Sequence, residues 1–181
     1  SGTAQAWLSW SASPGAASYN VQRAVVNGGP YTLLANVSAT TYTDNTANNG
    51  VRYFYVVSAV GDGVAGPNSL QAAAIPLASG YYRFVNRVSG LALEDPNGAG
   101  SGGVVQQPYS GTNQVWRVFH LGSGIFAVLS GANSAALSGL TPSAQLTLSP
   151  FTSLSYQLWT FHNPTGTDYL VRNLNTGEVM D

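Results

Sequence analysis

One short phrase occurs twice in the second half of the chain. Residues 114–120 read QVWRVFH and residues 157–162 read QLWTFH, which places the two tryptophans 43 residues apart. Periods of this length belong to structural units that cannot bury their apolar face alone and therefore stack on copies of themselves. The repeat predicts an architecture built from equivalent copies of one small unit.

The repeat begins well before its glutamine. Three segments open in the same way, namely YYRFVNRVSGLALE at 81–94, IFAVLSGANSAALS at 125–138 and YLVRNLNTGEVMD at 169–181. Aligning them gives two shared positions, one with Leu93, Leu137 and Met180, the other with Gly90, Ser134 and Gly177. The sequence therefore predicts two full repeats and the opening of a third, whose own Gln-x-Trp is expected beyond Asp181.

Both halves of the chain are predicted to be all-β. Short alternating or apolar runs are separated by clusters of Gly, Pro, Asn and Ser, and no long stretch has the apolar period of a helix. The segment AAAIPLASG at 72–80 separates two different patterns. We expect a first domain at residues 1–76, a linker at 77–80 and a second domain at 81–181.

The first strand of the first half shows alternation. In AWLSW, Ala6, Leu8 and Trp10 share one strand face, while Trp7 points the other way. Three surroundings remain open for Trp7: cover by another chain, contact with a ligand, or partial burial under a loop.

The strands and turns of the first half also carry a family resemblance. The runs LSWSASPGAASYNVQRA and NGVRYFYVVSAV resemble bacterial fibronectin type III domains over about residues 4–76. The resemblance implies a β-sandwich with Trp10, Tyr19, Val21 and Tyr53 in its core. It also implies one more strand before this run, so the first strand is expected to be missing or supplied from elsewhere.

The doubled Gln-x-Trp phrase and the openings VSGLALE and NTGEVMD carry a second resemblance. They are similar to the ricin-type β-trefoil, a lectin fold, over about residues 80–181. The resemblance implies a sugar pocket made by an acid just after the leucine of the opening, an aromatic ring nine residues before the tryptophan, and a polar residue before the glutamine. Such a pocket supplies fixed hydrogen-bonding groups for hydroxyls and a flat ring for the apolar sugar face.

Carried onto this sequence, the pocket pattern is complete in no repeat. The first repeat has Glu94 and then Asp95 at the acid position and Asn113 at the polar position; Gln107 occupies the stacking position, with Tyr109 two residues on. The second has Ser138, Pro150 and Tyr156, and its site is expected to be lost. Asp181 falls at the acid position of the third. The candidate sugar-binding residues are therefore Glu94, Asp95, Tyr109, Asn113 and Asp181.

Two interpretations of the first repeat stay open. It is either a working sugar pocket or part of a degenerate trefoil that keeps its core and binds no sugar. Under both, the residues of the repeated phrase are expected to be structural. The predicted core residues are Trp10, Tyr53, Gln114, Trp116, Gln157 and Trp159.

Composition excludes several classes of function. Only 7% of the 181 residues are charged, against about 25% in ordinary domains, and the net charge is −1. Neither a nucleic-acid-binding surface nor a polybasic membrane patch can be built from this, and no apolar run is long enough to span a membrane. Cysteine is absent, and no catalytic triad, metal cluster or cofactor motif can be assembled. We expect no catalytic residue, no metal and no cofactor.

Two functions compete on these grounds. The first is a non-catalytic carbohydrate-binding accessory region of a secreted or cell-surface bacterial protein, with the sandwich as spacer, the trefoil as sugar-binding module and a polysaccharide or glycan as partner. The second is a structural subunit of an extracellular fibre or surface assembly that shares strands with neighbouring copies. Sparse charge favours the second because like-charge repulsion between surfaces is weak.

Overall fold

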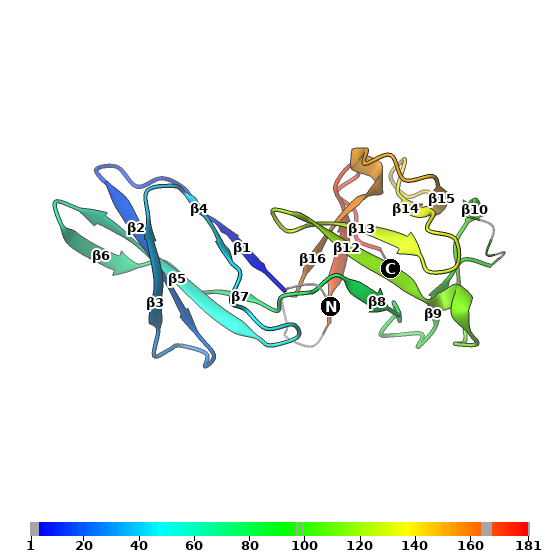
Figure 1. The fold of residues 1–181 in the computed structure, drawn as a ribbon, viewed down its shortest axis with the longest axis horizontal. Helices are drawn as coiled ribbons and strands as arrows, with labels where there is room; N and C mark the ends of the chain where they lie inside the picture. The colour runs from blue at the N-terminus through cyan, green and yellow to red at the C-terminus, as the bar shows by residue number, and fades with distance from the viewer. Residues whose placement is uncertain (1–3, 97, 99, 164–167, 181) are drawn as a thin grey trace. The chain divides into compact units, whose positions relative to one another are not determined.

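The computed structural model describes residues 4–96, 98, 100–163 and 168–180. Within these residues the regular structure consists of β-strands and two short 3-10 helices, so the all-β prediction is confirmed. The described residues divide into two compact units. The first unit consists of residues 4–77 with Asn163, and the second unit consists of the described residues of 78–162 with 168–180. Figure 1 shows the strands of both.

The first unit is a fibronectin type III-like β-sandwich, as the sequence predicted. Strands β1 and β4 pair in one sheet, and the other sheet has the order β3-β2-β5-β6, with β7 also pairing with β5. The strands are β1 (Ala6–Ser9), β2 (Ser18–Ala24), β3 (Thr32–Val37), β4 (Thr41–Asp44), β5 (Tyr53–Gly61), β6 (Val64–Asn68) and β7 (Ala72–Ala74).

The core of the first unit joins its two sheets. Ala6 on β1 packs in one cluster with Tyr53 and Tyr55 on β5, and all three are buried. Leu8 is partly buried against the same cluster, whereas Trp7 is 41% exposed. The alternation seen in AWLSW therefore sorts the β1 side chains between core and surface as expected.

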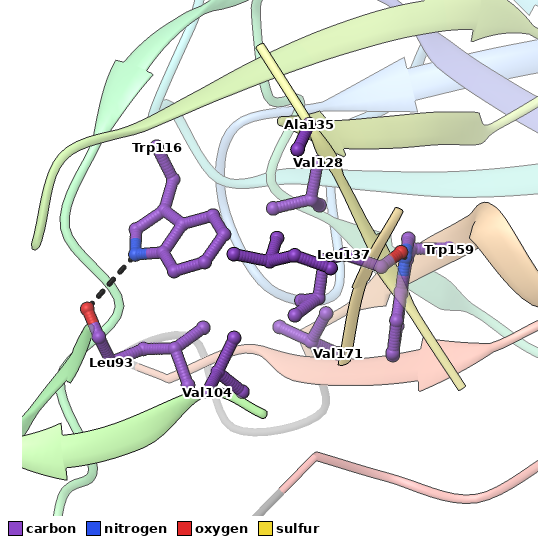
Figure 2. Packing of buried hydrophobic residues seen from close by; sticks show 9 residues of the cluster. Leu93, Val104, Trp116, Val128, Ala135, Leu137, Trp159 and Val171 are labelled. Carbon is purple, nitrogen blue, oxygen red and sulfur yellow. Dashed lines mark hydrogen bonds between the residues drawn. The ribbon is translucent and has the colours of Figure 1, made fainter. Parts of the chain in front are cut away.

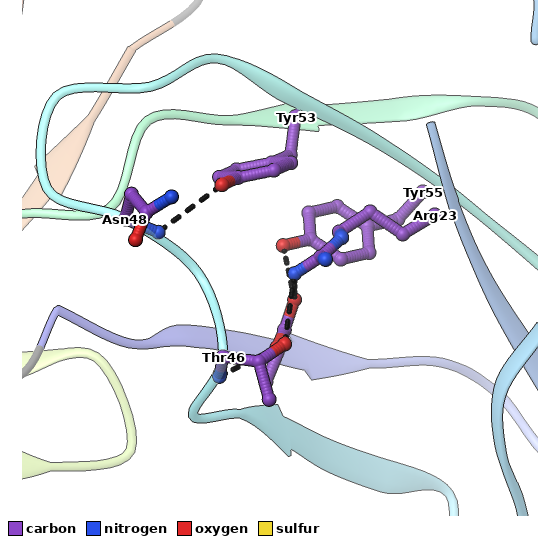
Figure 3. Close-up of polar contacts among 6 residues, drawn as sticks. Arg23, Thr46, Asn48, Tyr53 and Tyr55 are labelled. Carbon is purple, nitrogen blue, oxygen red and sulfur yellow. Dashed lines mark hydrogen bonds and ion pairs between the residues drawn. The ribbon is translucent and has the colours of Figure 1, made fainter. Parts of the chain in front are cut away.

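Two aromatic residues of the first unit have defined partners. The ring of Trp10 meets Tyr19 edge-on, with 5.6 Å between centroids, and Trp10 is only partly buried. The Tyr53 hydroxyl accepts a hydrogen bond from the backbone N–H of Asn48 at 3.2 Å, which ties β5 to the preceding loop (Figure 3).

Asp44, at the end of β4, is the centre of a buried polar network. Its Oδ2 accepts hydrogen bonds from Arg23 Nη1 at 2.7 Å and the Tyr55 hydroxyl at 2.9 Å, and its Oδ1 accepts from Thr46 N and Oγ1 (Figure 3). Burial raises the pKa of Asp44, but the hydrogen bonds from Thr46, Tyr55 and Arg23 outweigh it and hold that pKa below its ordinary value. Burial and the neighbouring Asp44 carboxylate raise the pKa of Tyr55.

The second unit contains the sequence repeats. One large sheet has the order β10-β15-β14-β13-β12-β8, with β16 pairing with β13 and β17, while β9 pairs with β11. The elements are β8 (Gly80–Tyr82), β9 (Ala92–Glu94), β10 (Gly102–Gly103), β11 (Val105–Gln107), η1 (Thr112–Gln114), β12 (Trp116–Gly122), β13 (Ile125–Ser130), β14 (Ala136–Ser138), β15 (Thr147–Ser149), η2 (Ser155–Gln157), β16 (Leu158–His162) and β17 (Leu170–Asn173).

The three repeat openings fold into the same turn. In each turn, the backbone carbonyl of a polar residue accepts a hydrogen bond from the backbone N–H of the residue four positions later. The donor residue has a positive φ. The pairs are Gly90 N to Asn86 O, Ser134 N to Ser130 O and Gly177 N to Asn173 O, with φ of 70°, 65° and 73° at the donors. The alignment from the sequence therefore corresponds to a repeated backbone geometry.

Gly90 is needed for its backbone conformation rather than for space. A Cβ added there would meet no atom within 4 Å, but the φ of 70° is one that L side chains rarely adopt. We expect Gly90→Ala to lower the free energy of unfolding of the second unit by about 1–2 kcal/mol, measured by urea denaturation. Gly111→Ala is the matched control, because Gly111 also has open space but an extended φ of 168°. Equal effects of the two substitutions would contradict the conformational explanation.

The two Gln-x-Trp phrases also occupy equivalent places. The indole N–H of Trp116 donates to Leu93 O at 2.9 Å, and that of Trp159 donates to Leu137 O at 3.0 Å. Both tryptophans are buried, at 0% and 1% exposure, and share one apolar cluster with Val128 and others (Figure 2). Each tryptophan therefore packs in the common core and hydrogen-bonds the backbone of the leucine in its own repeat opening.

Candidate functional site

Glu94, the last residue of β9, is held by the glutamine of the first repeated phrase. Gln114 Nε2 donates to Glu94 Oε2 at 2.9 Å and to Pro108 O at 2.8 Å, while Gln114 Oε1 accepts from Ser110 N at 2.6 Å. Gln114 is 1% exposed, and Glu94 is partly exposed. The buried amide thus orients a carboxylate that still reaches solvent.

Asn113 is joined through its backbone to the residue that follows Glu94. Its backbone oxygen accepts a hydrogen bond from Asp95 N at 2.9 Å, so the residue that follows Glu94 is bound to the residue that precedes Gln114. The Asn113 side chain borders the loop after β9, since a Cβ built on Gly98 would lie 3.4 Å from Asn113 Oδ1. The fold therefore brings Glu94, Asn113 and Gln114 together from segments about twenty residues apart.

Asp95, the second acid among the candidate sugar ligands, lies apart from this group. It is 1% exposed, and its Oδ2 accepts hydrogen bonds from Ser130 Oγ at 3.0 Å and Asn133 Nδ2 at 2.8 Å. Adjacent residues of an extended segment point to opposite sides, and this one points toward the second repeat. Asp95 thus joins two repeats inside the fold, where its side chain is almost fully shielded from solvent.

An exposed ring stands on the loop that Gln114 holds. Tyr109 lies between Pro108 and Ser110, both bound by the Gln114 amide, and is 54% exposed. The Arg83 guanidinium lies 4.3 Å from the centroid of its ring. Gln107, at the stacking position of the resemblance, is exposed and carries no ring, so Tyr109 is the aromatic group available there.

The second repeat has the same scaffold without the acid. Gln157 Nε2 donates to Ser149 Oγ at 2.9 Å and to Pro150 O at 2.8 Å, and Ser149 Oγ also lies 2.9 Å from Ser138 Oγ. Ser138 is fully buried. A neutral pair of hydroxyls therefore occupies the place that Glu94 has in the first repeat. In the third repeat, Asp181 lies outside the described residues.

A cavity in the second unit was not foreseen from the sequence. It has a volume of about 740 Å³ and is lined from all three repeats, including Leu93, Gln106, Thr141, Trp159, Glu178 and Met180. None of Glu94, Tyr109 and Asn113 lines it, so it is separate from the candidate pocket. The residues that line the cavity are far apart in the chain, so no local sequence pattern indicates it.

Two further features bear on the class of function. In the part of the chain that the structure describes, no three histidine or acidic side chains are grouped so that they could hold a metal ion. That part also lacks any helix with the length and apolar character needed to cross a membrane.

The chain is similar to known proteins in sequence and in structure. The family model for the ricin-type β-trefoil lectin domain-like family matches residues 70–147. Amylopullulanases from Thermoanaerobacterium saccharolyticum and Thermoanaerobacter thermohydrosulfuricus are each 48% identical over 61 residues, which are 33% of this chain. The chain spans only 5% and 4% of the length of these relatives.

Two solved structures are similar to parts of the chain. The designed threefold-symmetric protein ThreeFoil is 27% identical with a TM-score of 0.53, over 56% of this chain and 77% of that chain. An Fn3-like protein from Clostridium thermocellum is 49% identical, over 39% of this chain and 75% of that chain, with a TM-score of 0.38. The sandwich assignment of the first unit rests on its strand order rather than on that second likeness.

Proposed function

We propose that the chain is a non-catalytic carbohydrate-binding region of a larger secreted bacterial protein, because residues 70–147 match the model of the ricin-type β-trefoil lectin domain-like family. Glu94 and Asn113 supply the hydrogen-bonding groups of its pocket, and Tyr109 supplies the ring. The observation that carries this proposal is the Gln114 amide, which binds Glu94 and both neighbours of Tyr109. The first unit acts as a spacer.

The similarity to amylopullulanases supports an accessory role beside an enzyme of polysaccharides. It also makes amylopectin and pullulan the first polymers to test, followed by xylan and galactan. The catalytic part of such an enzyme belongs to other segments of the protein. The sugar is expected to be read by few polar groups around one exposed ring, as in other small-molecule sites.

Removal of the pocket's polar groups is expected to weaken glycan binding. Glu94→Ala and Asn113→Ala should each lower affinity at least about tenfold, because each removes a hydrogen-bonding group that faces the sugar. Affinity electrophoresis of the full chain in gels containing each polymer measures this. Tyr156→Ala is the matched control, since Tyr156 is the second-repeat equivalent of Asn113 and that repeat lacks the acid. Unchanged binding in both pocket variants, or no binding to any polymer, argues against the proposed function.

A structural role in an assembly is the second candidate. Within the described residues β1 pairs with β4 alone, and Trp7 on β1 is 41% exposed. A strand with a free edge is a template for pairing with another chain. The corresponding test is the mass of the chain in solution over a wide concentration range. Growth into filaments that Trp7→Ala prevents supports this role, and a monomer at all concentrations rejects it.

A further inference from the structure

The outer face of strands β8 and β12 carries an unusual set of side chains. On β12, the side chains of Trp116 and Val118 are fully buried. The alternate side chains, those of Arg117 and Phe119, are exposed, and Phe119 is 40% exposed. Tyr81 on the adjacent strand β8 is 69% exposed. The strict alternation of a strand thus places an arginine and two aromatic rings on the solvent side of this sheet.

These side chains form one continuous stripe with the ring of Tyr109. Arg117 lies directly opposite Tyr81 across the β12–β8 pair, and its guanidinium is 5.4 Å from the Phe119 ring centroid. Arg83 follows Tyr81 by two residues and is exposed as well; its guanidinium is 4.3 Å from the Tyr109 ring centroid. We call Tyr109, Arg83, Tyr81, Arg117 and Phe119 the aromatic–arginine stripe.

The stripe is positively charged and open. Among the described residues the ion pairs are Arg23 with Asp44 and Arg87 with Asp168, and neither involves Arg83 or Arg117. A guanidinium presents a planar fork of donors that matches a carboxylate, and exposed rings offer flat apolar faces. The complementary ligand therefore bears carboxylates at intervals between flat, partly apolar faces.

Carbohydrate fits this surface better than peptide. Peptides bind sheets at a free strand edge or in a groove. Among the described strands β12 is hydrogen-bonded on both sides, to β8 and β13, while β8 pairs with β12 alone and has a free edge. The stripe side chains of β8 and β12 project from the face of the sheet and not from that edge, and none of the five residues lines the cavity of the second unit. Pyranose rings need only flat aromatic platforms with polar groups between them. The sheet face presents that combination.

We propose that the aromatic–arginine stripe is a second binding site, for an acidic polysaccharide of the uronic acid class. Arg83 and Arg117 bind the sugar carboxylates, and the rings of Tyr81, Tyr109 and Phe119 stack on sugar faces. The proposal extends the proposed function by a charged glycan ligand. It shares only Tyr109 with the Glu94 pocket, so the two sites are tested with different residues and different polymers.

The test compares polygalacturonate with its fully methyl-esterified, neutral form, using the full chain and isothermal titration. We expect the acidic form to bind at least about tenfold more tightly, and binding to weaken as ionic strength rises. The Arg83→Gln/Arg117→Gln double variant should lose this preference. Arg87→Gln removes the same charge from an exposed ion pair of the second unit and should bind like the unchanged protein.

Each outcome decides between the sites. Equal affinity for both polymers, or an acidic preference that survives in the double variant, overturns the stripe proposal. Poly-glutamate that binds as tightly as polygalacturonate overturns the assignment to carbohydrate. Acidic binding that persists in Asn113→Ala supports an independent stripe. If no neutral glycan binds while polygalacturonate does, the Glu94 pocket is rejected and the stripe is retained.

Discussion

Replacement of Trp116 by alanine is expected to lower the free energy of unfolding of the second unit by about 3–5 kcal/mol, the usual cost of removing a buried indole from a core. Trp116 is fully buried, so the substitution leaves a cavity against Val128 and Leu137. It also leaves Leu93 O without its indole donor. This loss is a large fraction of the total free energy of unfolding of an ordinary domain, which is about 5–15 kcal/mol. We therefore expect the second unit to be partly unfolded at room temperature.

Thermal unfolding followed by circular dichroism measures the loss, and hydrogen exchange of peptides assigns it to one unit. Trp116→Phe should lose less than Trp116→Ala because it keeps most of the apolar volume. Trp7→Ala in the first unit is the control and should stay within about 0.5 kcal/mol, since Trp7 is 41% exposed. A loss below about 1 kcal/mol for Trp116→Ala would show that Trp116 is not part of a close-packed core.

Asp44→Ala is expected to destabilise the first unit by about 2–4 kcal/mol, because it leaves the buried Tyr55 hydroxyl without its acceptor and the partly exposed Arg23 without its carboxylate. Arg23, Tyr55 and Thr46 all donate to this carboxylate, and Asp44 is fully buried. Urea unfolding of the purified chain measures the loss. Asp168→Asn breaks an ion pair with Arg87 that is exposed on both sides, and should cost at most about 1 kcal/mol.

We expect the same carboxylate to contribute to the pH dependence of the stability of the first unit. The folded-state pKa of Asp44 lies below its ordinary value. Its stabilising contribution is therefore fully present above the unfolded-state pKa of about 4 and is lost as pH falls through the folded-state value. Asp44→Asn should be less stable at neutral pH and should show a weaker dependence on pH below about 4. A wild-type stability that does not change in that window contradicts this account.

Local pattern was sufficient to predict much of the fold. The alternation around Trp7 and the turn shared by Gly90, Ser134 and Gly177 depend on residues close together in the chain. The repeat spacing located the two tryptophans because each copy must present the same residue to the common core.

The candidate site was less predictable, and long-range contacts explain why. Asp95 follows Glu94 and reads as a second surface acid, but its partners Ser130 and Asn133 lie 35 and 38 residues away. The pairing of Tyr81 with Arg117 likewise depends on strand register, which leaves no trace in either segment alone. Neither feature could be derived without the arrangement of the repeats.

The two glutamines of the repeated phrase separate folding from recognition. Gln114 and Gln157 bind the loop ahead of them in the same way, yet one turns its amide to the acid Glu94 and the other to the hydroxyl of Ser149. The buried amide is thus satisfied by an acid of the repeat opening in one copy and by a hydroxyl close before the glutamine in the other, so this framework does not depend on an acid at the position of Glu94. The copies within one molecule are therefore free to diverge at this position while each keeps the same framework.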